Sequence, residues 1–270
     1  MKEMKILNKE SAEAGKIKLP KQFQEEVRPD IIKRSFEAIM SHSRQSYGAD
    51  PRAGKRYSAR LSKRRRKYRG SYGKGISRVP RKIITRRGLQ FNWVGAFAPG
   101  TVGGRRAFPP TAEKVWSLKI NDKERKKAIR SALSATINKD FLVLRGHQIP
   151  KEFPFIVNDD FENIKKTKDV LVVLKKLGFE DELKRSSRKK IRPGKGKLRG
   201  RFYKKAKGVL IVTGNDKSEI LKSAKNIPGI DVVLIKNINT MLLAPGGVPG
   251  RLTLFTKSAI EMMDEEGLFV

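Results

Sequence analysis

The chain has 270 residues and a formal net charge of +35 at pH 7, because 62 Lys and Arg face only 27 Asp and Glu. A charge this large predicts a polyanionic partner. The absence of cysteine excludes disulfides, cysteine-ligated zinc and thiol catalysis. The longest apolar run, 170–174, is too short for a membrane helix, and the opening MKEMKILNKE lacks a signal-peptide core. We therefore expect no membrane partner.

The first part of the chain predicts two short extended segments and one helix. The extended segments are 5–7 and 16–19. Pro29 is suited to the first turn of a helix, and Asp30 follows where the helix dipole favours an acid. Apolar residues then recur at helical spacing up to Met40. Gly48 and Pro51 end this part of the chain.

A long basic stretch follows at 44–110. It contains 19 Lys and Arg and one acid, a net charge of +18. Only 11 of its 67 residues are Leu, Ile, Val or Phe, which is too few for a core of its own. Tyrosine, tryptophan and phenylalanine alternate with the basic residues, a composition typical of chains that neutralise phosphates and stack on bases. The alternative is a solvated basic linker.

The remainder alternates between helical patterns and continuous apolar runs. In chain order, we expect a helix over 121–137, a buried strand at 141–144, a helix over 167–178, a strand at 209–212, a helix over 216–225, a strand at 232–235, an extended segment at 242–243, a strand at 252–255 and a helix over 256–265 capped by Thr256. This order predicts an α/β fold, a three-layer α/β/α sandwich with a mostly parallel central sheet, interrupted by a long basic extended loop.

A second basic stretch, 184–207, carries 13 Lys and Arg and no acid, a net charge of +13. Pro193 and three glycines favour an extended segment that approaches a ligand closely over a basic helix. The alternative is a patch like a nuclear-localisation signal. We therefore expect a globular α/β domain formed by 1–43 and 111–270, with 44–110 inserted in it and 184–207 as a second RNA-contacting segment.

Nucleotide-binding motifs fail on inspection. Gly196 and Lys197 are followed by Leu198, which breaks the Walker pattern, and Arg78 stands where a dinucleotide motif at 73–78 needs its third glycine. The prolines of PGGVPG at 245–250 favour a rigid turn before the last strand over a phosphate loop.

Metal and catalytic sites are not indicated either. His42 and His147 have no partner at metal-ligand spacing. The pair Asp159–Asp160 could bind a metal, but a helix start is the expected role. No nucleophile, base and orienting group stand together, so we expect no enzyme activity, no cofactor, no metal and no small-molecule substrate.

Motifs spread over nearly the whole chain carry a family resemblance. They are VGGRRAFPP (102–110), INDKERKKAIRSALSAT (120–136), RGHQIP (145–150), KTKDVLVVLKKLG (166–178), KKIRPGKGKLRGRFYKKAKGVLIV (189–212), KNIPGIDV (225–232) and LLAPGGVPGRLTLFTKSAI (242–260). In this order they resemble the large-subunit ribosomal protein four family, in its archaeal and eukaryotic branch. The short C-terminus is typical of archaeal members.

The resemblance implies a cytoplasmic location and a structural constituent of the large ribosomal subunit that supports assembly and translation. Its globular domain would lie on the outer surface of 23S-type ribosomal RNA. Its long loop would thread between RNA helices to the wall of the polypeptide exit tunnel. Neighbouring large-subunit proteins would be further partners, and the tip of protein twenty-two would form the narrow point of the tunnel with this loop.

The candidate rRNA-binding residues are the cations and one tyrosine of the two basic stretches: Arg64, Arg65, Arg66, Lys67, Tyr68, Arg69, Lys74, Arg78, Arg81, Lys82, Arg86, Arg87, Arg105, Arg106, Lys189, Lys190, Arg192, Lys195, Lys197, Arg199 and Arg201. Tyr72 and Trp93 are candidates for base stacking, with packing inside the loop as the alternative. Two rival functions are an RNA-modifying enzyme, which would need a cofactor loop, and a DNA-compacting protein, which should bind duplex DNA as well as structured RNA.

Overall fold

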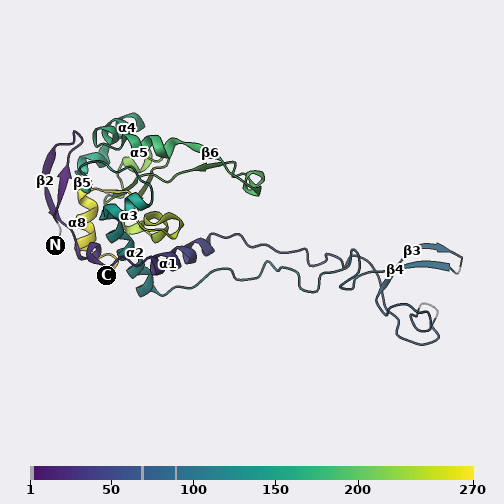
Figure 1. Ribbon diagram of the computed structural model, residues 1–270. Coiled ribbons are helices and arrows are strands. Elements are labelled where there is room, and N and C mark those ends of the chain that lie inside the picture. The colour runs from purple at the N-terminus through teal and green to yellow at the C-terminus, as the bar shows by residue number, and fades with distance from the viewer. Residues whose placement is uncertain (1–2, 68–69, 89) are drawn as a thin grey trace. The chain divides into compact units, whose positions relative to one another are not determined.

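The computed structural model describes residues 3–67, 70–88 and 90–270, and the chain divides into two compact units (Figure 1). Unit 1 consists of Met1–Ser43 and Ser117–Val270, and unit 2 consists of Arg44–Trp116. The predicted basic insert, 44–110, thus lies inside unit 2, and the second basic stretch lies in unit 1. Within the described residues, no helix combines the length and apolar character that crossing a bilayer requires.

The elements of unit 1 alternate between strands and helices along most of the chain. The strands are β1 (Glu3–Leu7), β2 (Glu13–Lys18), β5 (Phe155–Val157), β6 (Lys189–Ile191), β7 (Tyr203–Lys205), β8 (Leu210–Thr213), β9 (Asp231–Leu234) and β10 (Thr253–Phe255). The helices are α1 (Pro29–His42), α2 (Asp122–Ile137), α3 (Lys139–Leu144), α4 (Thr167–Lys176), α5 (Glu180–Ser187), α6 (Ile220–Ser223), α7 (Thr240–Leu243) and α8 (Lys257–Glu265).

The strands of unit 1 confirm a mixed α/β class. One sheet has the order β2-β1-β5, with β1 and β5 parallel and β2 antiparallel at the edge. A second sheet, β10-β8-β9, is parallel throughout, and a single parallel bridge joins Val157 to Thr256. The single, mostly parallel central sheet predicted from the sequence is not confirmed, because the described strands belong to separate three-stranded sheets and to two-stranded pairs.

The core lies on both faces of the parallel strands. Side chains of β8 alternate between two apolar clusters: Leu210 and Val212 join one cluster with Leu133 of α2, whereas Ile211 joins the other with Leu174 of α4. All residues of β8 are buried. Burial on both faces explains why this strand is a continuous apolar run rather than an alternating one.

Two predicted extended segments are wrong, because both are short helices. Residues 141–144 belong to α3, which buries Leu142 but leaves Val143 and Leu144 exposed. Residues 242–243 belong to α7, where the side chain of Asn239 accepts a hydrogen bond from the Leu242 amide at 2.9 Å. Short apolar runs fit a strand or one helical turn equally well, and the side-chain cap decides the matter here.

The other predicted helices differ from the observed ones mainly at their ends, but α5 was not predicted, and its residues 184–187 are helical where an extended segment was expected. The helix predicted over 216–225 is reduced to α6. Thr256 precedes α8 as predicted, but its hydroxyl donates to Oε1 of Glu162 over 2.7 Å instead of capping the helix. Asp159 accepts from the Ser258 amide at 2.7 Å, so an acid distant in sequence supports the start of α8. Asp159 also begins a 3₁₀ helix, Asp159–Asn163, which confirms its predicted helix-start role.

Unit 2 contains an antiparallel hairpin, β3 (Arg81–Arg87) and β4 (Gln90–Gly95), with an irregular register after Ile83. The two limbs of the unit lie side by side (Figure 1), and the Ala49 amide donates to the Pro110 carbonyl over 2.9 Å. Tyr47 stacks on Trp116 with ring centres 5.4 Å apart. This stack explains why the unit extends beyond residue 110.

Candidate nucleic-acid interface

Most of the predicted cations of unit 2 have exposed side chains. The exposed residues are Arg64, Arg65, Arg66, Lys67, Lys74, Arg78, Arg86, Arg87 and Arg106. Arg81, Lys82 and Arg105 are half-buried. Tyr68 and Arg69 lie outside the described residues. The structure therefore displays a dense positive surface. Such a surface attracts anions and is suited to binding phosphate.

Aromatic rings of unit 2 lie directly beneath some of these cations. The Arg78 guanidinium lies 4.7 Å from the ring centre of Tyr72, and the Lys74 ammonium lies 5.1 Å from that of Trp93. Tyr72 and Trp93 are half-buried. Cation–π contacts hold the charged groups without neutralising them, so they remain able to bind phosphate. These contacts pack one face of each ring against a cation within the unit.

In unit 1, β6 and β7 form an antiparallel ribbon of two strands joined by a 3₁₀ turn, Lys195–Arg199. Lys189 stands directly opposite Lys205, and Lys190 opposite Lys204. Like charges in directly opposed positions repel each other, so the isolated ribbon is electrostatically unfavourable. A polyanion bound along the ribbon would relieve this repulsion.

The predicted cations of the ribbon fall into two groups. Lys189, Lys190, Lys195, Lys197, Arg199 and Arg201 are exposed. Arg192 is half-buried, and its Nε donates to the Arg201 carbonyl over 3.0 Å. Gly196 lies so close to the Arg192 side chain that an added Cβ would be 2.6 Å from its Cδ. Arg192 therefore shapes the turn in addition to carrying charge.

The ends of the second basic stretch are bound within unit 1. Nη2 of Arg185 lies 2.6 Å from Oε1 of Glu182 and donates to the Lys207 carbonyl over 2.6 Å. The Lys207 ammonium lies 2.9 Å from Oδ2 of Asp231. Glu182 stands three residues before Arg185, a spacing visible in the sequence. Nothing near Lys207 in the sequence points to Asp231.

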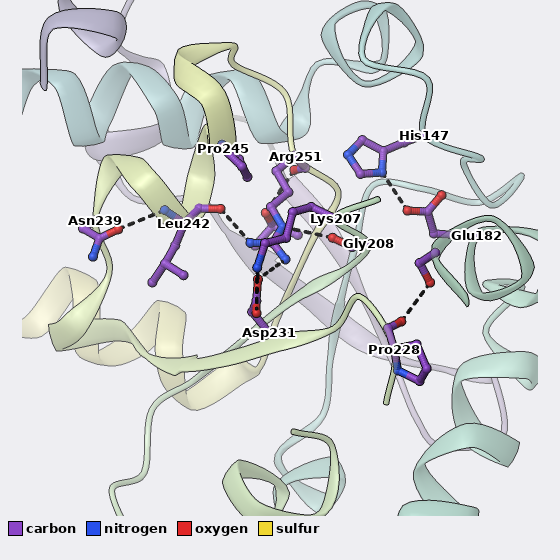
Figure 2. A network of polar contacts seen from close by, with 12 residues as sticks. His147, Glu182, Lys207, Gly208, Pro228, Asp231, Asn239, Leu242, Pro245 and Arg251 are labelled. Atoms are coloured by element: carbon purple, nitrogen blue, oxygen red, sulfur yellow. Dashed lines mark hydrogen bonds and ion pairs between the residues drawn. The ribbon is translucent and has the colours of Figure 1, made fainter. Parts of the chain in front are cut away.

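Arg251, which the sequence analysis did not single out, anchors the base of the ribbon (Figure 2). Its side chain is fully buried, and it donates from Nε to the Gly208 carbonyl and from Nη1 to the Leu242 carbonyl, both over 2.9 Å. Nη2 donates to Asp231 over 2.6 Å. Burial alone would raise the pKa of Asp231, but the hydrogen bonds and charges of Lys207 and Arg251 outweigh it and lower that pKa.

The PGGVPG segment forms the predicted turn, which includes a 3₁₀ helix at Pro245–Gly247. Arg145 donates to the Pro245 carbonyl over 2.5 Å and also to the Val248 carbonyl. Burial, with Arg251 and Arg185 nearby, lowers the pKa of Arg145 to about 10. Arg145 thus stays charged at neutral pH and stabilises the turn through its hydrogen bonds to these two carbonyls.

His147 is part of a buried polar cluster. Its Nδ1 lies 2.7 Å from Oε1 of Glu182 (Figure 2), and burial lowers the pKa of the imidazole. In the described parts of the chain, three or more His, Asp or Glu side chains do not gather as a metal site requires. His147 therefore acts here as a hydrogen-bond partner that orients Glu182.

Comparison with known proteins identifies the family. The model of the ribosomal protein L4/L1 family matches residues 17–266. The chain is 50% identical to the large ribosomal subunit protein uL4 of Nanoarchaeum equitans over 99% of both chains. It is 44% identical to the proteins of that name from Archaeoglobus fulgidus, over 97% of this chain and 98% of the relative, and from Sulfolobus acidocaldarius, over 97% and 94%. The chain therefore belongs to the ribosomal protein L4/L1 family.

Proposed function

We propose that this chain is a structural constituent of the large ribosomal subunit of the cytoplasmic ribosome, where it binds 23S-type ribosomal RNA and supports assembly and translation. The observation that carries the proposal is the pair of exposed basic surfaces, one on unit 2 and one on the β6–β7 ribbon. The names of its relatives place those proteins in the large subunit. The role is structural, as in the family to which the chain belongs.

The physical task of both surfaces is to neutralise phosphate. Arginine is suited to this task because its planar guanidinium binds phosphate oxygens through two parallel hydrogen bonds. In unit 2, Arg64, Arg65 and Arg66 are consecutive and exposed, so they can contact phosphates of more than one RNA segment. In the ribbon, bound phosphates would offset the repulsion between the opposed lysines.

The globular part of the chain and the inserted loop would have different roles. The globular part, 1–43 and 111–270, would lie on the outer surface of the RNA and contact it through the segment 184–207. The loop 44–110 would thread between RNA helices and reach the wall of the polypeptide exit tunnel. Protein twenty-two would approach the same loop at the narrow point of the tunnel. These placements follow from the family resemblance, and the charge of the loop supports them.

Cosedimentation with large subunits tests the proposal. We expect the full chain to remain with the large subunit after washing at moderate salt, and release at that salt would contradict stable incorporation. A second chain lacking 60–98 separates the two surfaces. We expect it to retain detectable RNA binding through unit 1, whereas complete loss of binding would show that the loop carries all of the affinity.

A further inference from the structure

Unit 2 contains a cavity of about 1070 Å³, and several of the cations that line it are among those expected to bind rRNA. Residues of the segment 57–67, together with Ser71, Val79 and residues of the hairpin strands β3 and β4, line it. A bridge between Arg60 and Arg81 joins that segment to β3, and a second bridge joins Ser62 to Gly70. Backbone pairing within one unit therefore supports the wall of this open cavity, and its volume lies just above the range of about 300–1,000 Å³ typical of small-ligand pockets.

The charge of the cavity wall selects an anion. Six cations line it: Arg60, Lys63, Arg64, Lys67, Arg81 and Lys82. Among the described residues, no Asp or Glu lines it. Cations gathered around a concave surface reinforce one another's potential and attract a phosphate into it.

Two aromatic side chains, Tyr57 and Trp93, also line the cavity. The Lys82 ammonium lies 3.9 Å from the ring centre of Tyr57. Aromatic rings beside cations are the combination that binds a nucleotide, because a base stacks on a ring face that no cation covers while the cation pairs with the phosphate. A simple inorganic anion would leave the aromatic wall unused.

Unpaired hydrogen-bond donors favour the same ligand. Ser71 Oγ, Arg81 Nε and Trp93 Nε1 are buried, and none has a hydrogen-bond partner among the described residues. All three residues line the cavity. Buried donors without partners are costly, so their concentration around one cavity indicates that a ligand supplies the acceptors. Base carbonyl and ring nitrogen atoms, with phosphate oxygens, are such acceptors.

We infer that this cavity receives a single nucleotide extruded from an RNA strand. The inference rests on the proposed function, since it assumes that unit 2 meets RNA. Bulges and loops are the natural source, because an unpaired base costs the least to remove from its stack. A free nucleotide has the same chemistry, so the experiment must separate these two sources.

The test compares two RNA hairpins that differ by one unpaired adenosine. The full chain is titrated with each hairpin, and we expect the bulged hairpin to bind about tenfold more tightly, as stacking of one base on an aromatic side chain predicts. Adenosine 5′-monophosphate is then added as a competitor. Displacement of the bulged hairpin by millimolar monophosphate would assign the site to free nucleotides, whereas its retention assigns it to a strand.

The two tryptophans of the chain supply a matched control. Trp93→Phe keeps an aromatic ring but removes the buried donor. We therefore expect the ratio of the affinities for the bulged and the unbulged hairpin to fall about fivefold. Ser71→Ala should reduce the preference in the same direction. Trp116→Phe removes the tryptophan outside the cavity and should leave the preference intact. In that variant, emission from Trp93 should change when the bulged hairpin binds.

The outcomes separate this inference from the proposed function. Equal affinity of the unmodified chain for both hairpins would overturn the cavity inference while leaving RNA binding in place. Equal effects of the two tryptophan substitutions would also overturn it. Failure to bind either hairpin, together with failure to cosediment with large subunits, would refute the proposed function and the inference with it.

Discussion

Arg251 and Asp231 form an ion pair in which Nη2 lies 2.6 Å from Oδ2, although the arginine side chain is fully buried. The same guanidinium holds the carbonyls of Gly208, just after the ribbon, and Leu242 in α7. One side chain therefore links the base of the basic ribbon to β9 and to α7. The ribbon carries repelling charges, so a fixed base is what allows it to project as an ordered element.

Replacing Arg251 with methionine should destabilise unit 1 by about 3 kcal/mol, because it removes one partner of a buried ion pair and leaves two carbonyls without donors. Urea unfolding of the full chain measures this difference. Arg199→Met at the exposed ribbon turn is the control and should change the stability by less than about 0.5 kcal/mol. Equal effects of the two substitutions would show that the buried arginine does not anchor the fold.

Elements with a continuous apolar run or with apolar residues at helical spacing could be predicted from the sequence, and elements without such a pattern could not. The apolar runs of β8 and β9 and the spacing in α1 and α2 correspond to the observed elements. The runs at 141–144 and 242–243 are helical because Asn138 and Asn239 cap them, and an apolar run does not carry that information. β6 and β7 lie in the stretch 184–207 that was predicted to be extended, but their pairing could not be predicted because their exposed residues have no apolar face.

The free energy of unfolding should fall as the pH is lowered from 7.5 to 5.5. His147 is buried and its pKa is lowered from the ordinary 6.5, so below about pH 6.5 the unfolded chain takes up a proton that the folded chain resists. The loss approaches at most about 1.4 kcal/mol per pH unit. The stability contributed by Glu182, whose pKa is also lowered, is lost only at more acidic pH, below its ordinary value of 4.5.

His147→Asn should flatten this pH dependence, which urea unfolding at several pH values measures. The other histidine, His42, is exposed, and His42→Asn should leave the slope unchanged. Arg185 and Arg145 also face His147 and stay charged throughout this range, so they do not contribute to the slope. A slope that persists in His147→Asn would contradict the assignment.

Two glycines of the PGGVPG turn should differ sharply in their tolerance of alanine. Gly246 and Gly250 both have a positive φ, of +81° and +92°. A Cβ at Gly246 has open space, whereas at Gly250 it would be 2.6 Å from the Phe141 carbonyl oxygen. We expect Gly246→Ala to cost about 1 kcal/mol from backbone strain alone. Gly250→Ala should cost about 3 kcal/mol, because α3 must also move.

Thermal or urea unfolding of both alanine variants tests this difference. Similar losses of stability in the two variants would mean that α3 moves away from position 250 without an energetic penalty. The comparison also bears on what the motif does. If the motif were a phosphate loop, both substitutions would weaken ligand binding. If it is a packed turn, the substitutions change only the free energy of unfolding. The close approach of Gly250 to Phe141 favours the packed turn.

The candidate interface could be predicted as a region but not residue by residue. Runs of Lys and Arg indicated where exposed cations would be found. They could not show that Lys207, which is exposed like Lys197, pairs with Asp231 across the fold. Arg251 stands outside any basic run and was not considered. Pairing between residues distant in sequence decides which charges remain available, and composition does not record such pairing.

Unpaired and ion-paired cations of the same basic stretch should therefore differ in how they affect RNA binding. Arg199 and Lys184 are both exposed, but the Lys184 ammonium lies 3.2 Å from Oε1 of Glu180, whereas Arg199 has no ion pair among the described residues. If Arg199 contacts a phosphate, Arg199→Gln should lower the slope of log K against log salt by about 0.7–0.9, the value for one phosphate contact. Lys184→Gln should leave that slope unchanged. Filter binding of 23S-type RNA fragments across a salt series gives both slopes. Equal changes would mean that net charge, not the geometry of the ribbon, determines affinity, because a long-range field does not distinguish a paired lysine from a free arginine.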